Sequence, residues 1–346
     1  MENPRRGSLA LDQWRGLALV LVLVAHAFHE TSRVDGLGRV GVNLFFFISG
    51  VLVFRSLTAA PATAAWSRTR SFWFRRLRRL YPALLAYVGF LFLARFFCLS
   101  LPTTRFDYGF NNFFPTVPGA LLYYLNYMPW PTPALGHLWS LACEMQFYWL
   151  APLIFWCGGT TRRRRDMVFG GLMVGFLVMG AAEPFILAHP FAVVYKYHFE
   201  FSVWPMLAGF FCEYNKDWFA RCPQWLATWI FWLVIGICAA SLLLMAFGFK
   251  VKLLVVATGA LLLLPCWLAY ALHKPMPATA GQVLRWLGER TYSIYLWQQP
   301  FTICFFLPVP WWPIGALLAI PMGALWFRWF EFPFLSATRQ TKGNVA

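Results

Sequence analysis

Charged side chains are scarce in this chain of 346 residues: Asp, Glu, Lys and Arg make up 12% of it, against 60% hydrophobic residues. A soluble domain carries about 25% charged residues, so this composition excludes an ordinary soluble globular protein. Long apolar runs alternate with short basic loops. We therefore expect an all-α fold, a polytopic bundle of about ten transmembrane helices.

Acidic residues are the rarest charged class, with 13 Asp and Glu against 29 Lys and Arg, for a formal net charge of +16. In a soluble protein this excess would suggest a nucleic-acid partner. Here the arginines cluster between apolar runs, for example from Arg55 to Arg79 and from Arg162 to Arg165. The positive-inside rule explains this clustering more simply. It predicts cytoplasmic termini, membrane lipids as surroundings and no nucleic-acid partner.

The sequence also lacks the spacings that mark several kinds of site. Its eight cysteines include no C-x-x-C pair, so neither a disulfide framework nor a zinc site is indicated, and we expect no metal. The glycines of GQVLRWLG (281–288) do not form a phosphate-binding loop. With no internal repeat or soluble stretch, residues 1–346 are expected to form one transmembrane domain without an appended extracytoplasmic domain.

The apolar runs predict where the chain crosses the membrane. The segment SFWFRRLRRLYP mixes aromatic and basic residues, so we expect a separate interfacial helix that ends before Pro82. Residues 102–135 are expected to form an external loop with a re-entrant or interfacial piece. The expected spans are residues 9–29, 37–57, 82–101, 136–157, 167–188, 195–214, 224–248, 252–272, 286–307 and 312–332.

The first span, LDQWRGLALVLVLVAHAF (11–28), carries a cation near its start and an imidazole near its end. Arg15 and His26 are about three helical turns apart, so both side chains point to one face. The rise between them is about 16 Å, roughly half the hydrocarbon thickness. Ionisable groups inside a span usually mark function. A snorkelling arginine and an interhelical histidine hydrogen bond would explain the pair equally well.

A second polar stretch, HLWSLACEMQFYWLAPL (137–153), places a carboxylate inside a span. His137, Ser140 and Glu144 share one helical face. A buried carboxylate needs a partner, which His26 or Arg15 could supply, and a His–Glu pair would suit a general base. A purely structural clamp between two helices is the alternative interpretation.

Two further stretches offer binding groups. The run RRLRR (75–79) could hold phosphates through bidentate hydrogen bonds, although topology control and anionic lipids also explain it. The segment LGERTYSIYLWQQP (287–300) puts Tyr292, Tyr295 and Gln299 on one helical face. Such residues are also typical of the aromatic belt at a membrane surface.

Taken in order, these stretches resemble the integral-membrane acyltransferase family 3, whose members O-acylate sugars, polysaccharides and lipid-linked glycans. Two positions depart from the family pattern: Asn43 stands where many members carry Asp, and Gln298 stands where many carry His. The resemblance covers nearly the whole chain and rests on LDQWRGLALVLVLVAH, GVNLFFFISGVLV, FWFRRLRRLYPALL, HLWSLACEMQFYWLAPL, LGERTYSIYLWQQP and FEFPF.

The resemblance implies an O-acyltransferase of a bacterial inner membrane, with acyl-CoA, commonly acetyl-CoA, as the donor. On this reading His26 is the general base and Glu144 orients its imidazole. The basic groups expected to hold the donor are Arg15, Arg75, Arg76 and Arg79.

The acceptor is expected to be a hydroxyl of a carbohydrate or glycan. Acylation of a small secondary metabolite, a covalent acyl-histidine relay, and a transporter for a glycan or lipid intermediate remain alternatives, and a homo-oligomer is left open. The residues expected to contact the acceptor are Asn43, His137, Ser140, Tyr292, Tyr295 and Gln299.

Overall fold

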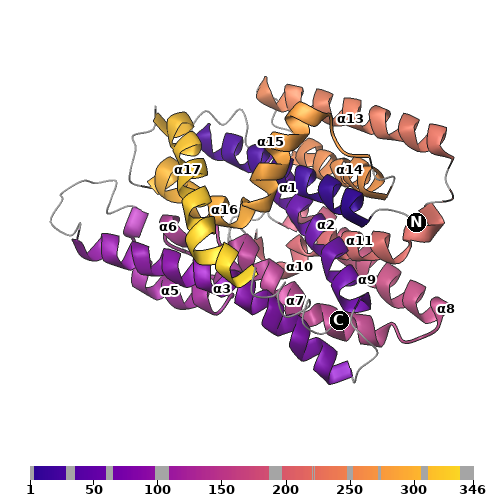
Figure 1. Ribbon diagram of the computed structural model, residues 1–346, viewed down its shortest axis with the longest axis horizontal. Helices are drawn as coiled ribbons and strands as arrows, with labels where there is room; N and C mark the ends of the chain where they lie inside the picture. Colours follow the sequence, from indigo (N-terminus) through magenta and orange to yellow (C-terminus); the bar gives the residue numbers. More distant parts are fainter. Residues whose placement is uncertain are drawn as a thin grey trace. The chain divides into compact units, whose positions relative to one another are not determined.

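The described part of this computed structural model is helical and contains no strand, which confirms the predicted all-α class for these residues. Contacts divide the chain into two compact units. Unit 1 comprises Met1–Thr58 and Leu150–Thr291, and unit 2 comprises Ala59–Trp149 and Tyr292–Ala346. The structure describes residues 4–28, 36–59, 65–97, 109–186, 197–219, 221, 223–247, 252–271, 274–304 and 311–335 (Figure 1).

Six helices of the described part are long and apolar enough to cross a membrane, so the chain is a multi-pass membrane protein. They are Leu9–Ala27, Leu37–Thr58, Trp66–Phe97, Arg162–Ala182, Gln224–Leu244 and Trp312–Leu335. The other four expected spans overlap helices outside this set, of which α11 has 11 residues and α16 has 9. They are α7 (Trp139–Cys157), α11 (Trp204–Tyr214), α14 (Lys252–Ala271) and α16 (Thr291–Gln299).

Unit 1 is organised around α1 (Pro4–Ala27), which packs against α2 (Leu37–Thr58) and α15 (Ala278–Glu289). Glycines make the α1–α15 contact close. A Cβ added at Gly16 would lie 1.9 Å from the Leu284 carbonyl oxygen, and one added at Gly288 would lie 1.8 Å from that of Asp12. Helix backbones approach this closely only where side chains are missing. Gly288 therefore lets α15 lie against the segment of α1 that carries Arg15.

The second close pair in unit 1 is α2 with α11, which lie side by side in Figure 1. A Cβ at Gly50 would lie 1.9 Å from the Met206 carbonyl oxygen, and one at Gly209 would lie 2.0 Å from that of Phe47. The other long helices of this unit are α9 (Gly171–Ile186), α13 (Gln224–Ala246) and α14, the last of which packs on α2 and α13.

Unit 2 contains one long helix, α3 (Ala65–Phe97), with Pro82 inside it. The prediction of a separate interfacial helix ending before Pro82 is therefore wrong. The basic, aromatic half of α3 docks on α7, because the Trp73 indole donates to the Tyr148 carbonyl at 3.0 Å and Phe72 is 1% exposed. Packing of this kind offsets the one backbone hydrogen bond that a proline costs a helix.

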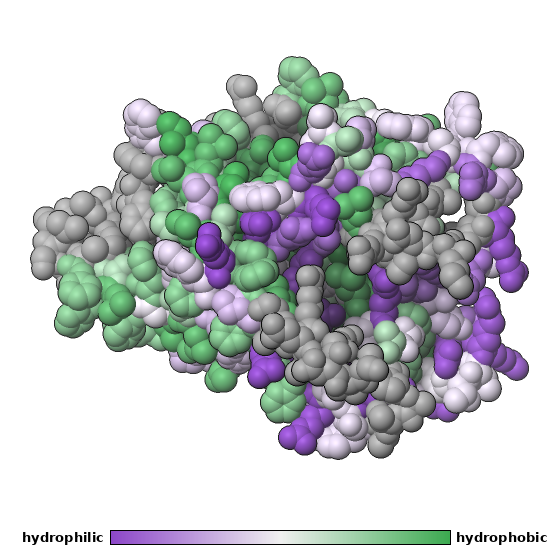
Figure 2. All heavy atoms as spheres, viewed as in Figure 1, coloured by the Kyte–Doolittle hydropathy of each residue, from purple (hydrophilic) through white to green (hydrophobic). Residues whose placement is uncertain are grey.

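The segment after α3 forms short helices. Within it, α5 (Phe113–Leu121) has 9 residues and η3 (Leu125–Tyr127) has 3, so neither can span a membrane. This agrees with the short piece expected within residues 102–135, of which 102–108 lie outside the described residues. Several large apolar side chains of α3 and α5 are exposed, and apolar spheres dominate this face (Figure 2, lower left).

The C-terminal part of unit 2 consists of α16, α17 (Trp312–Trp326) and two π-helical segments, η6 (Pro300–Cys304) and η8 (Phe327–Glu331). The η8 segment packs on α3. A Cβ at Gly323 would lie 2.4 Å from the Cα of Ile294, so α17 and α16 are in backbone contact. The η8 segment thereby lies next to the basic segment of α3.

Candidate active site

His26 lies near the end of α1, partly buried, in the continuous helix that the sequence predicted. Its Nδ1 is 2.9 Å from the carbonyl oxygen of Val22, one turn earlier. A carbonyl only accepts, so Nδ1 donates in this contact. In a neutral imidazole with its proton on Nδ1, Nε2 is the basic nitrogen.

Arg15 stands on the same helix, and its side chain is also partly buried. The unbroken helix from Pro4 to Ala27 keeps the predicted spacing, about 16 Å of rise with both residues on one face. Asn43 is buried in α2, which packs on α1 within unit 1. Unit 1 thus holds the predicted base, one predicted donor-binding cation and one predicted acceptor-binding amide.

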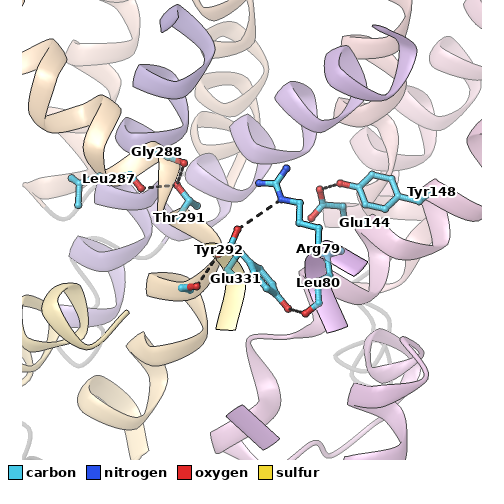
Figure 3. Close-up of polar contacts among 10 residues, drawn as sticks. Arg79, Leu80, Glu144, Tyr148, Leu287, Gly288, Thr291, Tyr292 and Glu331 are labelled. Atoms are coloured by element: carbon cyan, nitrogen blue, oxygen red, sulfur yellow. Dashed lines mark hydrogen bonds and ion pairs between the residues drawn. The ribbon is translucent and has the colours of Figure 1, made fainter. Parts of the chain in front are cut away.

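Glu144 belongs to unit 2, in the first half of α7, where the Tyr148 hydroxyl donates a short hydrogen bond to its carboxylate (Figure 3). The Arg76 guanidinium lies over the Tyr148 ring, 4.8 Å from its centroid, and over Phe72 at 5.3 Å. A cation on the ring face withdraws electron density and strengthens the phenol as a donor. The basic segment of α3 and the Glu144 carboxylate are thereby joined through one tyrosine.

Arg79 has a different partner. Its Nε is 3.8 Å from Oε1 of Glu331, whose side chain is 0% exposed, while the Ser293 hydroxyl donates to Oε2 at 2.8 Å (Figure 3). A fully buried carboxylate requires compensation, and Arg79 supplies it. Sequence analysis did not single out Glu331 or Ser293. The signal available in the sequence was an acidic residue, Glu331, within the apolar last span.

The tyrosines predicted to bind the acceptor make helix-to-helix contacts. Tyr292 donates its hydroxyl to the Leu80 carbonyl on α3 at 2.7 Å, and Tyr295 donates to the His137 carbonyl at 2.8 Å. The Tyr295 hydroxyl also lies 2.8 Å from Oγ of Ser140. These bonds tie α16 to α3 and α7 inside unit 2. Contact of any of these residues with an acceptor stays a prediction, as it does for Gln299, which is buried on α16.

The predicted site residues are thus divided between the two units: Arg15, His26 and Asn43 in unit 1, and the others in unit 2. The pairing of His26 with Glu144 stays a prediction. Within the described residues, no group of three or more His, Cys, Asp or Glu side chains could hold a metal ion.

Comparisons with known proteins now add to this geometry. The profile of a family described as "Acyltransferase domain" matches residues 8–336. The chain is 27% identical over 315 residues to YrhL of Bacillus subtilis, a candidate peptidoglycan O-acetyltransferase; the match covers 85% of this chain and 48% of YrhL. It is 31% identical over 148 residues to the peptidoglycan O-acetyltransferase OatA of Listeria monocytogenes, covering 41% of this chain and 23% of OatA.

A candidate O-acetyltransferase of Staphylococcus aureus is 30% identical over 152 residues, covering 42% of this chain and 24% of the relative. The matched part of the chain therefore covers about half the length of YrhL and about a quarter of the length of each of the other two relatives. No solved structure matches.

Proposed function

The chain belongs to the acyltransferase-domain family, which confirms the resemblance seen in its motifs, and on this premise we propose that it is a membrane O-acyltransferase. It moves an acetyl group from acetyl-CoA to a hydroxyl of a glycan. The names of the matched relatives support O-acetyl transfer, and two of those names, which specify peptidoglycan, support a carbohydrate acceptor. The observation that carries the proposal is the partly buried imidazole of His26, near the end of an apolar helix long enough to cross a membrane, with its Nδ1 hydrogen-bonded to the Val22 carbonyl.

His26 serves as the general base through Nε2. The acceptor oxygen attacks the thioester carbonyl carbon, a C–O bond forms and the C–S bond breaks. The hydroxyl proton passes to Nε2, and the imidazolium returns it to the departing CoA thiolate. A positioned base of this kind contributes about 10²–10⁴-fold to the rate. In this proposal the Glu144 carboxylate orients the imidazole and stabilises the imidazolium.

The basic segment of α3 suits a polyanionic donor. Among the described residues, no carboxylate forms an ion pair with Arg75 or Arg76, so their charges are not already neutralised. Arg79 shares its charge with Glu331 and holds the segment in place. Arg15 is assigned the guidance of the pantetheine end toward His26.

The ten-span arrangement with cytoplasmic termini is also part of the proposal. It places the start of α3, and with it the donor-binding arginines, on the cytoplasmic side of an inner membrane. The α3 helix has 33 residues and a rise of about 50 Å, longer than the hydrocarbon layer, so its basic first turns extend beyond that layer.

The reaction is tested with the purified protein in liposomes, supplied with radiolabelled acetyl-CoA and a soluble N-acetylglucosamine–N-acetylmuramic acid disaccharide. We expect labelled disaccharide and free CoA in equal amounts. Labelled protein that decays on adding disaccharide would favour the acyl-histidine relay. Movement of either compound across the bilayer without acetyl transfer would contradict the enzyme and favour a transporter.

The donor site is tested with Arg75→Gln/Arg76→Gln. We expect the KM for acetyl-CoA to rise at least tenfold, because two cations that would face phosphates are lost. The matched control is Arg70→Gln, which removes one exposed cation from the same helix and should leave this KM unchanged. An unaltered KM in the double variant would restrict the arginines to topology and lipid binding.

A further inference from the structure

The turn between α5 and η3 holds a tyrosine in an unusual backbone conformation. Among described residues other than glycine, Asn112 and Tyr123 have positive φ, each at 57°. Asparagine tolerates this left-handed region, whereas a bulky aromatic residue does not. Such a conformation is strained and persists only where the surroundings impose it.

The surroundings of this turn do impose it. The Gln146 side chain, on α7, donates to the Tyr123 carbonyl at 2.8 Å and exchanges two hydrogen bonds with the Asn126 amide, at 2.8 and 3.1 Å. On the other side, the Tyr81 hydroxyl donates to the Leu121 carbonyl at 2.7 Å. Helices α3 and α7 together therefore fix the backbone on both sides of Tyr123.

The side chain that this strained backbone presents carries a second cost. Tyr123 is 5% exposed, and its hydroxyl is buried without a hydrogen-bond partner among the described residues. A buried hydroxyl left unsatisfied destabilises the folded protein. The ring packs edge-on against Tyr81 at 5.4 Å, a contact that phenylalanine would make equally well. The hydroxyl thus contributes nothing to the stability of the free protein.

The neighbourhood of this hydroxyl is that of the candidate site. Burial, together with the nearby Tyr81, Glu144 and Tyr148, raises the pKa of the Tyr123 phenol, so it stays protonated and can donate. The hydroxyls of Tyr81 and Tyr148 are already donated, to Leu121 and to Glu144. Among these three tyrosines, Tyr123 is therefore the one whose hydroxyl has no acceptor among the described residues.

We propose that Tyr123 donates a hydrogen bond to an oxygen of the sugar acceptor, beside Glu144; this inference rests on the proposed function. A sugar hydroxyl both donates and accepts, so a carboxylate and a phenol on one side of it satisfy both roles. An anionic group would be repelled by Glu144, which favours a neutral hydroxyl as the ligand. Tyr123 then contributes to acceptor affinity and to selection of hydroxylated acceptors.

The test is Tyr123→Phe, which removes one oxygen and keeps the ring. Tyr124→Phe is the matched control, because Tyr124 is the next residue in the chain and its side chain is 40% exposed. We expect Tyr123→Phe to unfold at the same or a higher temperature than the wild type, since an unsatisfied hydroxyl is gone. We also expect about a tenfold rise in the KM for the disaccharide, which corresponds to ~1.4 kcal/mol, with the KM for acetyl-CoA unchanged.

Two results would overturn the inference. A lower unfolding temperature would show that the hydroxyl is structural, and an unchanged disaccharide KM would show that it does not touch the acceptor. Disaccharide binding followed by saturation-transfer NMR separates this test from the proposed function. If the wild type transfers no acetyl group, the proposed function is wrong. Weaker disaccharide binding by Tyr123→Phe than by the wild type would still support the contact, and equal binding would reject it.

Discussion

The ion pair of Arg79 with Glu331 permits a quantitative prediction. Replacing Arg79 by Met removes the positive charge that lies 3.8 Å from the fully buried Glu331 carboxylate. At 3.8 Å the attraction is about 4 kcal/mol with an effective dielectric of 20, and breaking a buried pair costs about 3–5 kcal/mol. Because Arg79 is 25% exposed, we expect about 3 kcal/mol. This lowers the unfolding midpoint by about 6–12 °C for a unit of roughly 150 residues.

The reverse change is milder. Glu331→Gln keeps an acceptor for the Ser293 hydroxyl and leaves a guanidinium that can still reach water, so we expect a loss of about 1 kcal/mol. The double variant Arg79→Met/Glu331→Gln removes both charges and should recover most of the stability lost in Arg79→Met. The measurement is the unfolding midpoint of the purified variants in one detergent.

The outcome that would refute this reasoning is specific. If Arg79→Met keeps the wild-type midpoint, the arginine does not compensate Glu331. If the double variant unfolds as early as Arg79→Met, the two residues are not coupled, and Arg79 stabilises the helix in another way.

Two further predictions concern packing and the Glu144 contact. Gly288→Val should lower the unfolding midpoint by several degrees, because the new side chain meets the Asp12 carbonyl. The control Gly171→Ala should not lower the midpoint, because a Cβ at that position meets nothing within 4 Å. Equal midpoints for the two variants would refute the close contact. Tyr148→Phe should reduce acetyl transfer about tenfold while leaving expression intact, because the Glu144 carboxylate loses its donor; unchanged transfer would place that bond outside the mechanism.

Local pattern was sufficient for much of this molecule. The first span, and the shared face of its Arg15 and His26, followed from length and from helical period. Pro82 shows where local rules fail, since the proline predicts a break and the docking of Phe72 and Trp73 on α7 sustains one helix. Tertiary packing overrode a strong local preference there.

The site was harder to predict because its contacts join distant segments. Arg79 and Glu331 meet from opposite ends of the chain, and no periodicity connects them. The left-handed conformation of Tyr123 is equally hidden, since sequence offers it only for glycine and asparagine. A phosphate-binding reading of RRLRR was reasonable, but the structure is needed to see that Arg79 faces a carboxylate while Arg76 covers a tyrosine ring.

The central claim is that His26 supplies the base for acetyl transfer. The most direct measurement is the rate at which His26→Gln transfers acetyl from acetyl-CoA to the disaccharide at saturating concentrations of both. The control is His198→Gln, another buried histidine of unit 1, which contacts Glu200 at 3.1 Å. The account predicts a loss of at least about 10²-fold for His26→Gln and near-wild-type transfer for the control. Transfer by His26→Gln at the rate of the wild type would contradict it.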